Sequence, residues 1–445
     1  MTGPDLLVLY TLASIGLLLV LILYVRMHAF LAMLVTSIGL GLACGMEPAK
    51  LLKSIQSGFG EALGFIAVVV ALGSIMGRYI EYSGGGRALA ETLLAKFGKD
   101  RAVWAVLTAS FLVGLPIFFE VGFIILLPLA LSLGRESKRS LLYFGLPIAR
   151  ALTVTHAMVP PHPAPAAAAQ LLGADLGLII LYGAMLSVPM TIAGGVIYGL
   201  WIAKRLYIPA PADKPETSGE QDALPPPNVW LVAVLLTLPV LLIFASTIAS
   251  RAGAGAKGFL TLIGHPFCAL AIAAFASMYF LGTRRGLDRE AVTRMATQAL
   301  APTASLLVIM GGGGAFKQVI VDSGVGAYAG KMLAASNISP LVLAWVVAAG
   351  MRVAQGSATV AIITAAGIVA PLVKGIPGYS SEMVVLALCA GGTILSHVND
   401  AGFWLVNQSF GMTVPQTLRS WTVMKVVTSM VGLAIVLAAQ ALFGK

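Results

Sequence analysis

The amino-acid sequence predicts an all-α protein that crosses a membrane many times. Of its 445 residues, 58% are hydrophobic and only 10% are charged, whereas soluble domains carry about 25% charged residues. Windows of roughly 20 mostly apolar residues, the length of a bilayer-spanning helix, recur along nearly the whole chain. The strict alternation expected of a transmembrane β-barrel is absent from the sequence, so helices must satisfy the backbone hydrogen bonds.

Each apolar window is expected to form one membrane-embedded segment. The first lacks a basic segment before it and a small-residue cleavage site after it, so we expect a retained helix rather than a signal peptide. The expected spans lie near 6–25, 30–46, 63–80, 103–133, 141–158, 178–203, 229–248, 258–281, 299–321, 340–373, 383–396 and 421–443.

The formal net charge of +10 does not indicate a nucleic-acid partner, because the basic residues are spread over short loops. Lys and Arg near span ends commonly set membrane orientation. On that rule the loops at 204–228 and 284–298 lie in the cytoplasm, although Arg251 and Lys257 in the loop between them reduce the contrast. The three cysteines show no paired or metal-binding spacing, and we expect neither a metal nor a cofactor.

A polar, proline-rich stretch at 209–228 predicts a flexible cytoplasmic linker between two transmembrane halves, 1–208 and 229–445. A weak internal repeat supports this division, with segments of about 60–203 matching about 299–443. The matches keep an offset of about 240 residues and pair 72–77 with 312–317, 116–120 with 355–359, and 155–156 with 396–397.

Two expected spans, 103–133 and 340–373, are too long for one straight crossing and carry an interruption near the middle. The first is interrupted by Gly114, Pro116 and Glu120, the second by the run from Gln355 to Thr359. Each fits a helical hairpin that enters and leaves on one side. Irregular backbone at membrane depth is tolerated beside protein or a water-filled cavity, so each tip is a candidate wall of a binding site.

Two further helices are expected to break for different reasons. Three prolines at 160–163 follow Thr155 and His156 and must end or unwind the first of these helices. In the second, the polar run from Ser396 to Asp400 separates two apolar segments. An ordinary kink at the membrane surface is the plain alternative. Ionisable residues inside a membrane are costly and usually functional, however, and broken helix ends offer dipoles to an ion. We therefore place a substrate here.

These segments together resemble the gluconate permease family of proton-coupled symporters, within the wider ion transporter superfamily, over nearly the whole chain. The resemblance rests on the runs FEVG at 119–122, TH at 155–156 with PPHP at 160–163, GGGGAFK at 311–317, VDSGV at 321–325, GSATV at 356–360 and SHVNDAGFW at 396–404.

The resemblance implies a secondary transporter, not an enzyme, that takes up gluconate or a related sugar acid with protons across the bacterial inner membrane. It also implies two inverted repeats with re-entrant hairpins and broken transmembrane helices, a homodimer and an elevator movement. A D-serine-transporting branch belongs to the same family, and the run SHVND at 396–400 looks more like its sugar-acid members.

Candidate site residues follow from the breaks. Backbone N–H groups and hydroxyls can hold a carboxylate without a full counter-charge. Gly356 lets the backbone approach closely. Proton-coupling groups must titrate, and Glu120 is the first choice, while the histidines cannot be ranked from one sequence. The substrate-binding candidates are Thr155, His156, Gly356, Ser357, Thr359, Ser396 and Asn399; the proton-coupling candidates are Glu120, His156, His162, His397 and Asp400.

Three other functions stay open at this stage. An anion channel or an antiporter would use the same broken helices without carrying substrate and proton in the same direction. An intramembrane metalloenzyme with His156, His162 and His397 as ligands is disfavoured, because the HExxH frame is absent and the spacing is unusual for zinc.

Overall fold

The computed structural model of the protein describes residues 4–210, 225–252, 257–324, 338–373, 376–397 and 400–443. Within these ranges the regular secondary structure is helical, as the sequence predicts. Most of the predicted linker, residues 211–224, lies outside the described residues.

The first half contains long helices interrupted by short connections. It comprises α1 (Pro4–Leu23), α2 (Ala29–Ala43), α3 (Pro48–Tyr82), α4 (Gly85–Phe97), the 3₁₀ turn η1 (Lys99–Arg101), α5 (Ala102–Val113), α6 (Phe119–Ser137), α7 (Leu142–Met158), α8 (Pro163–Leu172), α9 (Leu176–Thr191), the π-helical segment η2 (Ile192–Tyr198) and α10 (Gly199–Ala203).

The second half begins with helices that have no counterpart in the predicted repeat and then follows a similar order. It comprises α11 (Val229–Ala252), α12 (Lys257–Ile263), α13 (Pro266–Ser277), η4 (Met278–Gly282), η5 (Thr283–Arg285), α14 (Arg289–Leu300), η6 (Ala301–Thr303), α15 (Ala304–Asp322), α17 (Pro340–Gln355), α18 (Ala358–Val373), α19 (Ser381–Gly391), α20 (Ala401–Ser409), α21 (Val414–Thr417), the π-helical segment η7 (Leu418–Thr422) and α22 (Val423–Phe443).

Six helical stretches among the described residues are long and apolar enough to cross a bilayer. Other apolar helices, including α5, α17, α18 and α19, are shorter than a full crossing. The chain is therefore a multi-pass membrane protein that combines complete spans with shorter apolar helices. The full-length stretches are Pro48–Tyr82, Leu142–Leu172, Leu176–Ala203, Val229–Ser246, Pro266–Arg285 and Val414–Leu442.

The helix breaks fall at the predicted positions. The span predicted at 103–133 divides between α5 and α6, and the one at 340–373 divides between α17 and α18. The other two breaks separate α7 from α8 and α19 from α20. That each hairpin re-enters one membrane surface, and that the two halves are inverted repeats, stay predictions.

One span that was predicted to be a continuous helix is broken in the structure. The segment 258–281 was expected to be a single helix, but it is divided between α12 and α13 at Gly264 and His265. The Nδ1 atom of His265 accepts a hydrogen bond from the N–H of Phe267 at 3.3 Å and so caps α13. A histidine followed by proline is a helix-start signal that the apolar composition concealed.

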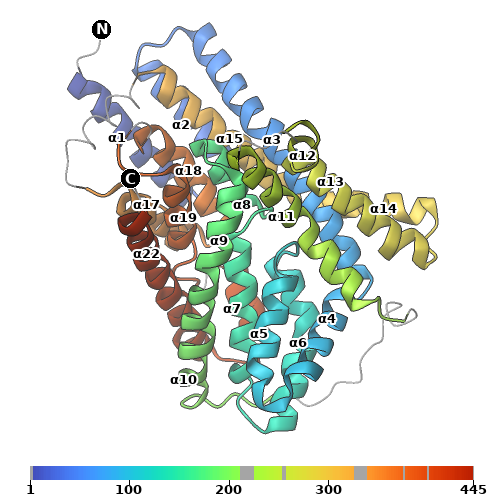
Figure 1. Ribbon diagram of the computed structural model, residues 1–445. Helices are drawn as coiled ribbons and strands as arrows, with labels where there is room; N and C mark the ends of the chain where they lie inside the picture. The colour runs from blue at the N-terminus through green and yellow to red at the C-terminus, as the bar shows by residue number, and fades with distance from the viewer. Residues whose placement is uncertain are drawn as a thin grey trace.

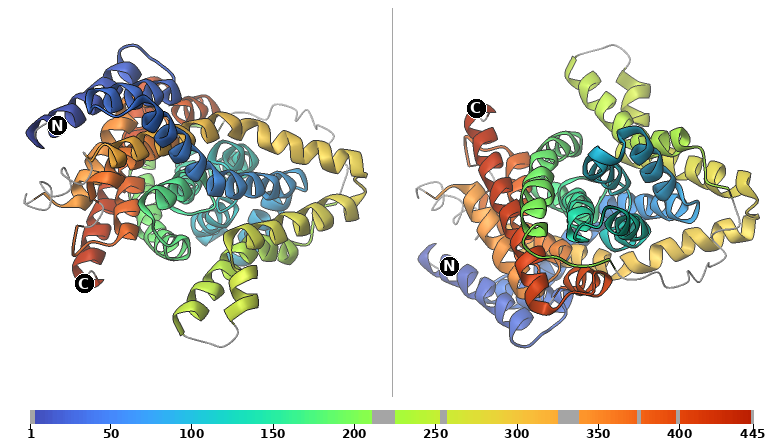
Figure 2. Two further views of the ribbon diagram at one scale, coloured as in Figure 1. Left: turned by 90° about the horizontal axis from the view of Figure 1, so that it is seen from above. Right: turned by 90° about the horizontal axis from the view of Figure 1, so that it is seen from below.

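The helices form three regions side by side (Figure 1). Helices α17, α19 and α22 lie along one side, α7, α8 and α9 occupy the middle, and α4, α5 and α6 form the lower end. Figure 2 shows both termini on the side of the molecule opposite α14. The broken helices connect the two halves of the chain. Helix α8 of the first half packs against α18 and α19 of the second, and α20 of the second half packs against α6 of the first.

Candidate functional site

A cavity of about 270 Å³ lies where the breaks of the two halves meet. Six of the residues singled out from the sequence line it: Glu120, His156, Gly356, Ser357, Thr359 and Asp400. Its other lining residues are Phe119, Thr153, Ala157, Arg352, Ala358, Thr393, Ala401, Gly402, Trp421 and Lys425.

The connection between α17 and α18 forms one wall of this cavity. Gly356 ends α17 with a positive φ of 80°, a left-handed conformation that glycine adopts without strain. The Ser357 hydroxyl accepts a hydrogen bond from the N–H of Val360 at 3.4 Å and caps the start of α18. In the first turn of α18, Thr359 Oγ1 lies 3.2 Å from Nε2 of His156. This wall thus presents two hydroxyl groups, and one of them contacts an imidazole ring.

The start of α6 forms the facing wall. The preceding irregular segment 114–118 ends at the helix start, so Glu120 stands in the first turn of α6. Its side chain is exposed in the cavity. The neighbouring Phe119 is buried, and its ring stacks on Trp421 with the centroids 5.7 Å apart. One carboxyl group of the first half thus lines the same cavity as the polar residues of the second.

Asp400 anchors the break between α19 and α20. Its side chain accepts hydrogen bonds from Ser396 Oγ and from the N–H of Gly402, the latter at 3.0 Å, and it forms an ion pair with Arg352. Trp421 Nε1 donates to Ser396 Oγ at 2.6 Å. Ser396 is thus engaged in holding the break together and does not line the cavity.

Two of the predicted histidines lie outside the cavity lining and bond to backbone carbonyls. The Nε2–H of His162 donates to the carbonyl of Gly114 at 2.6 Å, just after α5. The Nε2–H of His397 donates to the carbonyl of Val353 at 3.0 Å, in the last turn of α17. Each satisfies an acceptor that the end of a helix leaves without a partner.

The remaining predicted residues have different placements. Thr155 is buried and donates its hydroxyl to the carbonyls of Ala151 and Leu152, both at 3.0 Å, so it lies behind the cavity wall. Its Oγ1 atom sits against Gly114, where an added Cβ would approach to 2.4 Å. Asn399 lies outside the described residues.

Sequence reasoning missed the two cationic residues of the cavity. Arg352 and Lys425 are only 1% and 4% exposed, respectively. The Nζ atom of Lys425 lies 4.8 Å from the centroid of the Trp421 ring. The sequence could have revealed both residues, because they lie inside long apolar segments. Placing an ionisable side chain within the membrane costs free energy, so such a residue marks a candidate functional site.

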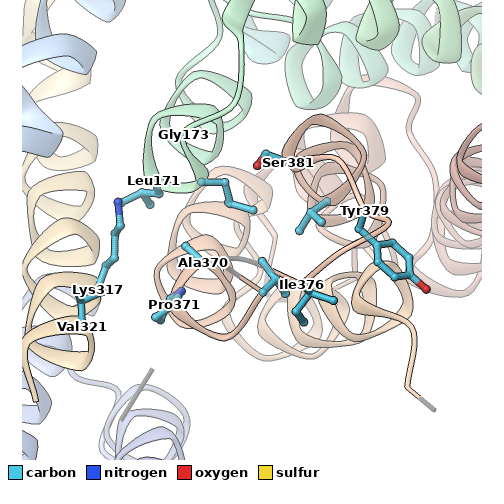
Figure 3. A pocket seen from close by; sticks show the side chains of 12 residues that line it. Leu171, Gly173, Lys317, Val321, Ala370, Pro371, Ile376, Tyr379 and Ser381 are labelled. Carbon is cyan, nitrogen blue, oxygen red and sulfur yellow. The ribbon is translucent and has the colours of Figure 1, made fainter. Parts of the chain in front are cut away.

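A second cavity, of about 290 Å³, lies at the ends of α8, α15, α18 and α19. Figure 3 shows the Lys317 side chain of α15 pointing toward Leu171 along one edge of it, with Tyr379 at the opposite edge. Among the described residues its polar side chains are limited to Lys317, Tyr379 and Ser381, and none of the predicted site residues lines it. A substrate site is expected to combine an apolar pocket with convergent polar groups, which favours the first cavity.

Comparison with known sequences identifies the family of the chain. Residues 6–442 match the model of the GntP family permease. The chain belongs to the GntP family. A gluconate permease of Pseudomonas aeruginosa is 44% identical over 98% of both chains. The high-affinity gluconate transporter of Escherichia coli is 39% identical over 94% of this chain and 96% of that one.

Another GntP relative and two solved structures extend the comparison. The Gnt-II system L-idonate transporter of Escherichia coli is 38% identical over 96% of this chain and 98% of that one. The YdaH transporter of Alcanivorax borkumensis has a TM-score of 0.66 at 17% identity, covering 88% of this chain and 89% of its own. For MtrF of Neisseria gonorrhoeae, the TM-score is 0.62 at 14% identity, with coverages of 87% and 84%. At these identities the structures show a shared fold alone.

Proposed function

We propose that this GntP permease takes up gluconate or a related sugar acid across the bacterial inner membrane by symport with protons. The observation that carries the proposal is the first cavity, where cationic side chains and hydroxyl groups converge at the helix breaks. Relatives named gluconate permease and L-idonate transporter support a polyhydroxylated acid as the substrate.

The polar wall at the start of α18 fits a sugar acid. Ser357 and Thr359 offer hydroxyl groups to substrate hydroxyls, and the Gly356 backbone leaves room for close approach. The helix dipole of α18 also favours negative charge near its start. In this arrangement His156 contacts the substrate beside Thr359.

Glu120 is the proposed proton-coupling residue. It lines the cavity, and in the described part of the chain no cation lies within 4.0 Å of its carboxylate. The other acid, Asp400, is held in an ion pair, and His162 and His397 are engaged with backbone carbonyls. Glu120 is therefore the carboxyl group best placed to exchange a proton with the contents of the cavity.

The working cycle proposed here is an elevator movement in a homodimer, with two inverted repeats and two re-entrant hairpins. The short apolar helices α5, α17 and α18 beside the breaks support the hairpins. The positions of the basic loops support a cytoplasmic linker at 209–228. The cross-packing of α8 on α18 and of α20 on α6 supports movement of the broken helices together with the hairpins.

Uptake of labelled gluconate, in cells without their own gluconate transport, tests the proposal. Accumulation above the outside concentration that collapses with a protonophore is the expected result. Uptake that only equilibrates would favour an anion channel, and proton movement opposite to the substrate would favour an antiporter. If verified membrane insertion brings no gluconate uptake, D-serine and other small organic acids should be assayed next, since both belong to the alternative substrate class.

A further inference from the structure

Three cationic side chains gather within one part of the membrane region. Arg352 and Lys425 line the first cavity, while Arg150 on α7 is fully buried beside α22. Buried charges in a membrane protein are costly and require compensation by a partner or a ligand. How much of this positive charge the protein itself neutralises determines what the cavity binds.

Arg352 is compensated in part. Its Nη2 atom forms the ion pair with Asp400, but Nε and Nη1 have no hydrogen-bond partner in the part of the chain that the structure describes. A guanidinium can hold two acceptors side by side. Nε and Nη1 are both enclosed by protein, so Asp400 is the recorded charge partner of Arg352 and the rest of the guanidinium adds positive charge behind the cavity wall.

Lys425 has no carboxylate partner of its own. Among the described residues, no carboxylate oxygen lies within 4.0 Å of its Nζ atom, whose recorded contact is the face of the Trp421 ring. A cation over an indole ring is attracted to it but keeps its full charge. Because Lys425 lines the cavity, an anion entering there meets an ammonium group that no carboxylate of the described residues contacts directly.

Arg150 adds positive charge behind this wall without reaching the cavity. None of its three guanidinium nitrogens has a hydrogen-bond partner within the described residues. It packs beneath the π-helical segment η2, where a Cβ on Gly195 would lie 3.2 Å from Cβ of Arg150 and one on Gly194 would lie 3.3 Å from its Cδ. The two glycines allow η2 to close over the arginine. Arg150 and Lys425 carry like charges and repel each other across η2, which packs against both α7 and α22.

When the formal charges of the ionisable side chains in this region are added, the cations exceed the anions by one. The cations are Arg150, Arg352 and Lys425, and the anions are Glu120 and Asp400. We propose that Lys425 binds the carboxylate of the substrate, and that Arg150 behind it makes the site selective for a monoanion over neutral and zwitterionic molecules. The proposal rests on the proposed function and deepens it by assigning the carboxylate end of the substrate.

This assignment gives the substrate a direction in the cavity. The carboxylate would lie at Lys425, and the hydroxyl-bearing chain would extend toward Ser357 and Thr359. A zwitterionic amino acid would bring an ammonium group close to the same cations, and this repulsion would select against it. The charge pattern therefore favours a sugar acid over D-serine.

The test compares gluconate with gluconamide, which has the same hydroxyl groups but a neutral carboxamide. Dissociation constants for both are measured on the purified full-length protein by isothermal titration, for the natural sequence, Lys425→Met and Lys425→Arg. Because removing one partner of a buried charge pair typically costs 2–5 kcal/mol, we expect Lys425→Met to lower the preference for gluconate by about thirtyfold or more. Lys425→Arg should restore a large part of it.

Lys317→Met is the matched control, since Lys317 is a half-buried lysine of a membrane helix that lines the second cavity instead. It should keep the natural preference. If Lys425→Met does not fold, Arg150→Gln carries the same test and should lower the preference by a smaller factor, because Arg150 acts from a distance. An unchanged preference in the folded variants, or equal weakening of both ligands, would overturn the assignment. Failure of the natural protein to bind gluconate at all would instead reject the proposed function.

Discussion

The two halves of the chain break their helices at corresponding places but use the breaks differently. In the first half, His162 donates a hydrogen bond to the carbonyl of Gly114, and Thr155 donates one to a carbonyl of its own helix. In the second half, Ser357, Thr359 and Asp400 all line the cavity, together with both of its cations. The first half contributes Glu120 and His156 to the polar lining.

The two halves therefore share the positions of their helix breaks but use different residue types to make them. One half interrupts its helix with prolines, which need no polar partner for the missing N–H. The other half uses a polar segment that must be held by an ion pair and several hydrogen bonds. We infer that the second half mainly recognises the substrate, and that the first half couples its movement to the proton. The following variants test this division of roles.

The largest effect is expected for Asp400→Asn. Removing the carboxylate leaves Arg352 buried without its charge partner, which typically costs about 3–5 kcal/mol of stability. Thermal unfolding of the purified protein and uptake assays should show a strongly destabilised, inactive variant. The double variant Asp400→Asn with Arg352→Gln removes both charges and should recover part of the stability. A single variant as stable as the natural protein would show that the ion pair is unimportant for the second break.

Glu120→Gln should separate transport from coupling. The amide keeps the shape of the side chain but cannot release a proton, so we expect proton-driven accumulation to be lost while exchange of labelled for unlabelled gluconate continues. Proteoliposomes with an imposed pH gradient provide the measurement. Glu91→Gln is a suitable control, because Glu91 lies on α4 in an exposed ion pair with Arg87. Accumulation by the Glu120 variant against a gradient would remove this residue from the coupling role.

Ser357→Ala and Thr359→Val should weaken substrate binding without abolishing coupling. Each removes one hydroxyl group, worth about 0.5–1.5 kcal/mol, so KM for gluconate should rise about two- to tenfold per variant. Thr155→Val is the comparison from the first half and should leave KM nearly unchanged, because its hydroxyl is bonded within its own helix. Equal KM values in all three variants would contradict the assigned division between the halves.

The smallest effect on transport is expected at the histidines beside the breaks. His162→Ala leaves the carbonyl of Gly114 without its partner and should cost about 1–3 kcal/mol of stability, with KM of the folded protein close to that of the natural one. His397→Ala makes the equivalent change at Val353 in the second half. Chemical or thermal unfolding in detergent compares the stability of the two variants. A large rise of KM in the His162 variant would instead indicate that His162 contributes to substrate binding.

The sequence alone was sufficient for the positions of these breaks and for six of the sixteen residues that line the cavity. Overlong apolar segments, prolines and polar runs are local features, so α5 and α6 separate where Pro116 stands, and α17 ends at Gly356. It was also sufficient for recognising the family, because the motifs that carry the resemblance include Glu120, His156, Gly356 and Asp400, and the family model matches residues 6–442. One break, at Gly264 and His265, was missed within an apolar segment.

Only the tertiary structure decided which polar groups face the cavity. Thr155 and His156 are neighbours in the chain, yet one points into its own helix and the other lines the cavity. Arg150, Arg352 and Lys425 come from three helices far apart in sequence, and no local pattern places them together. The physical reason is that local sequence determines where a helix begins and ends, whereas the direction in which a side chain points depends on how that helix packs against the others.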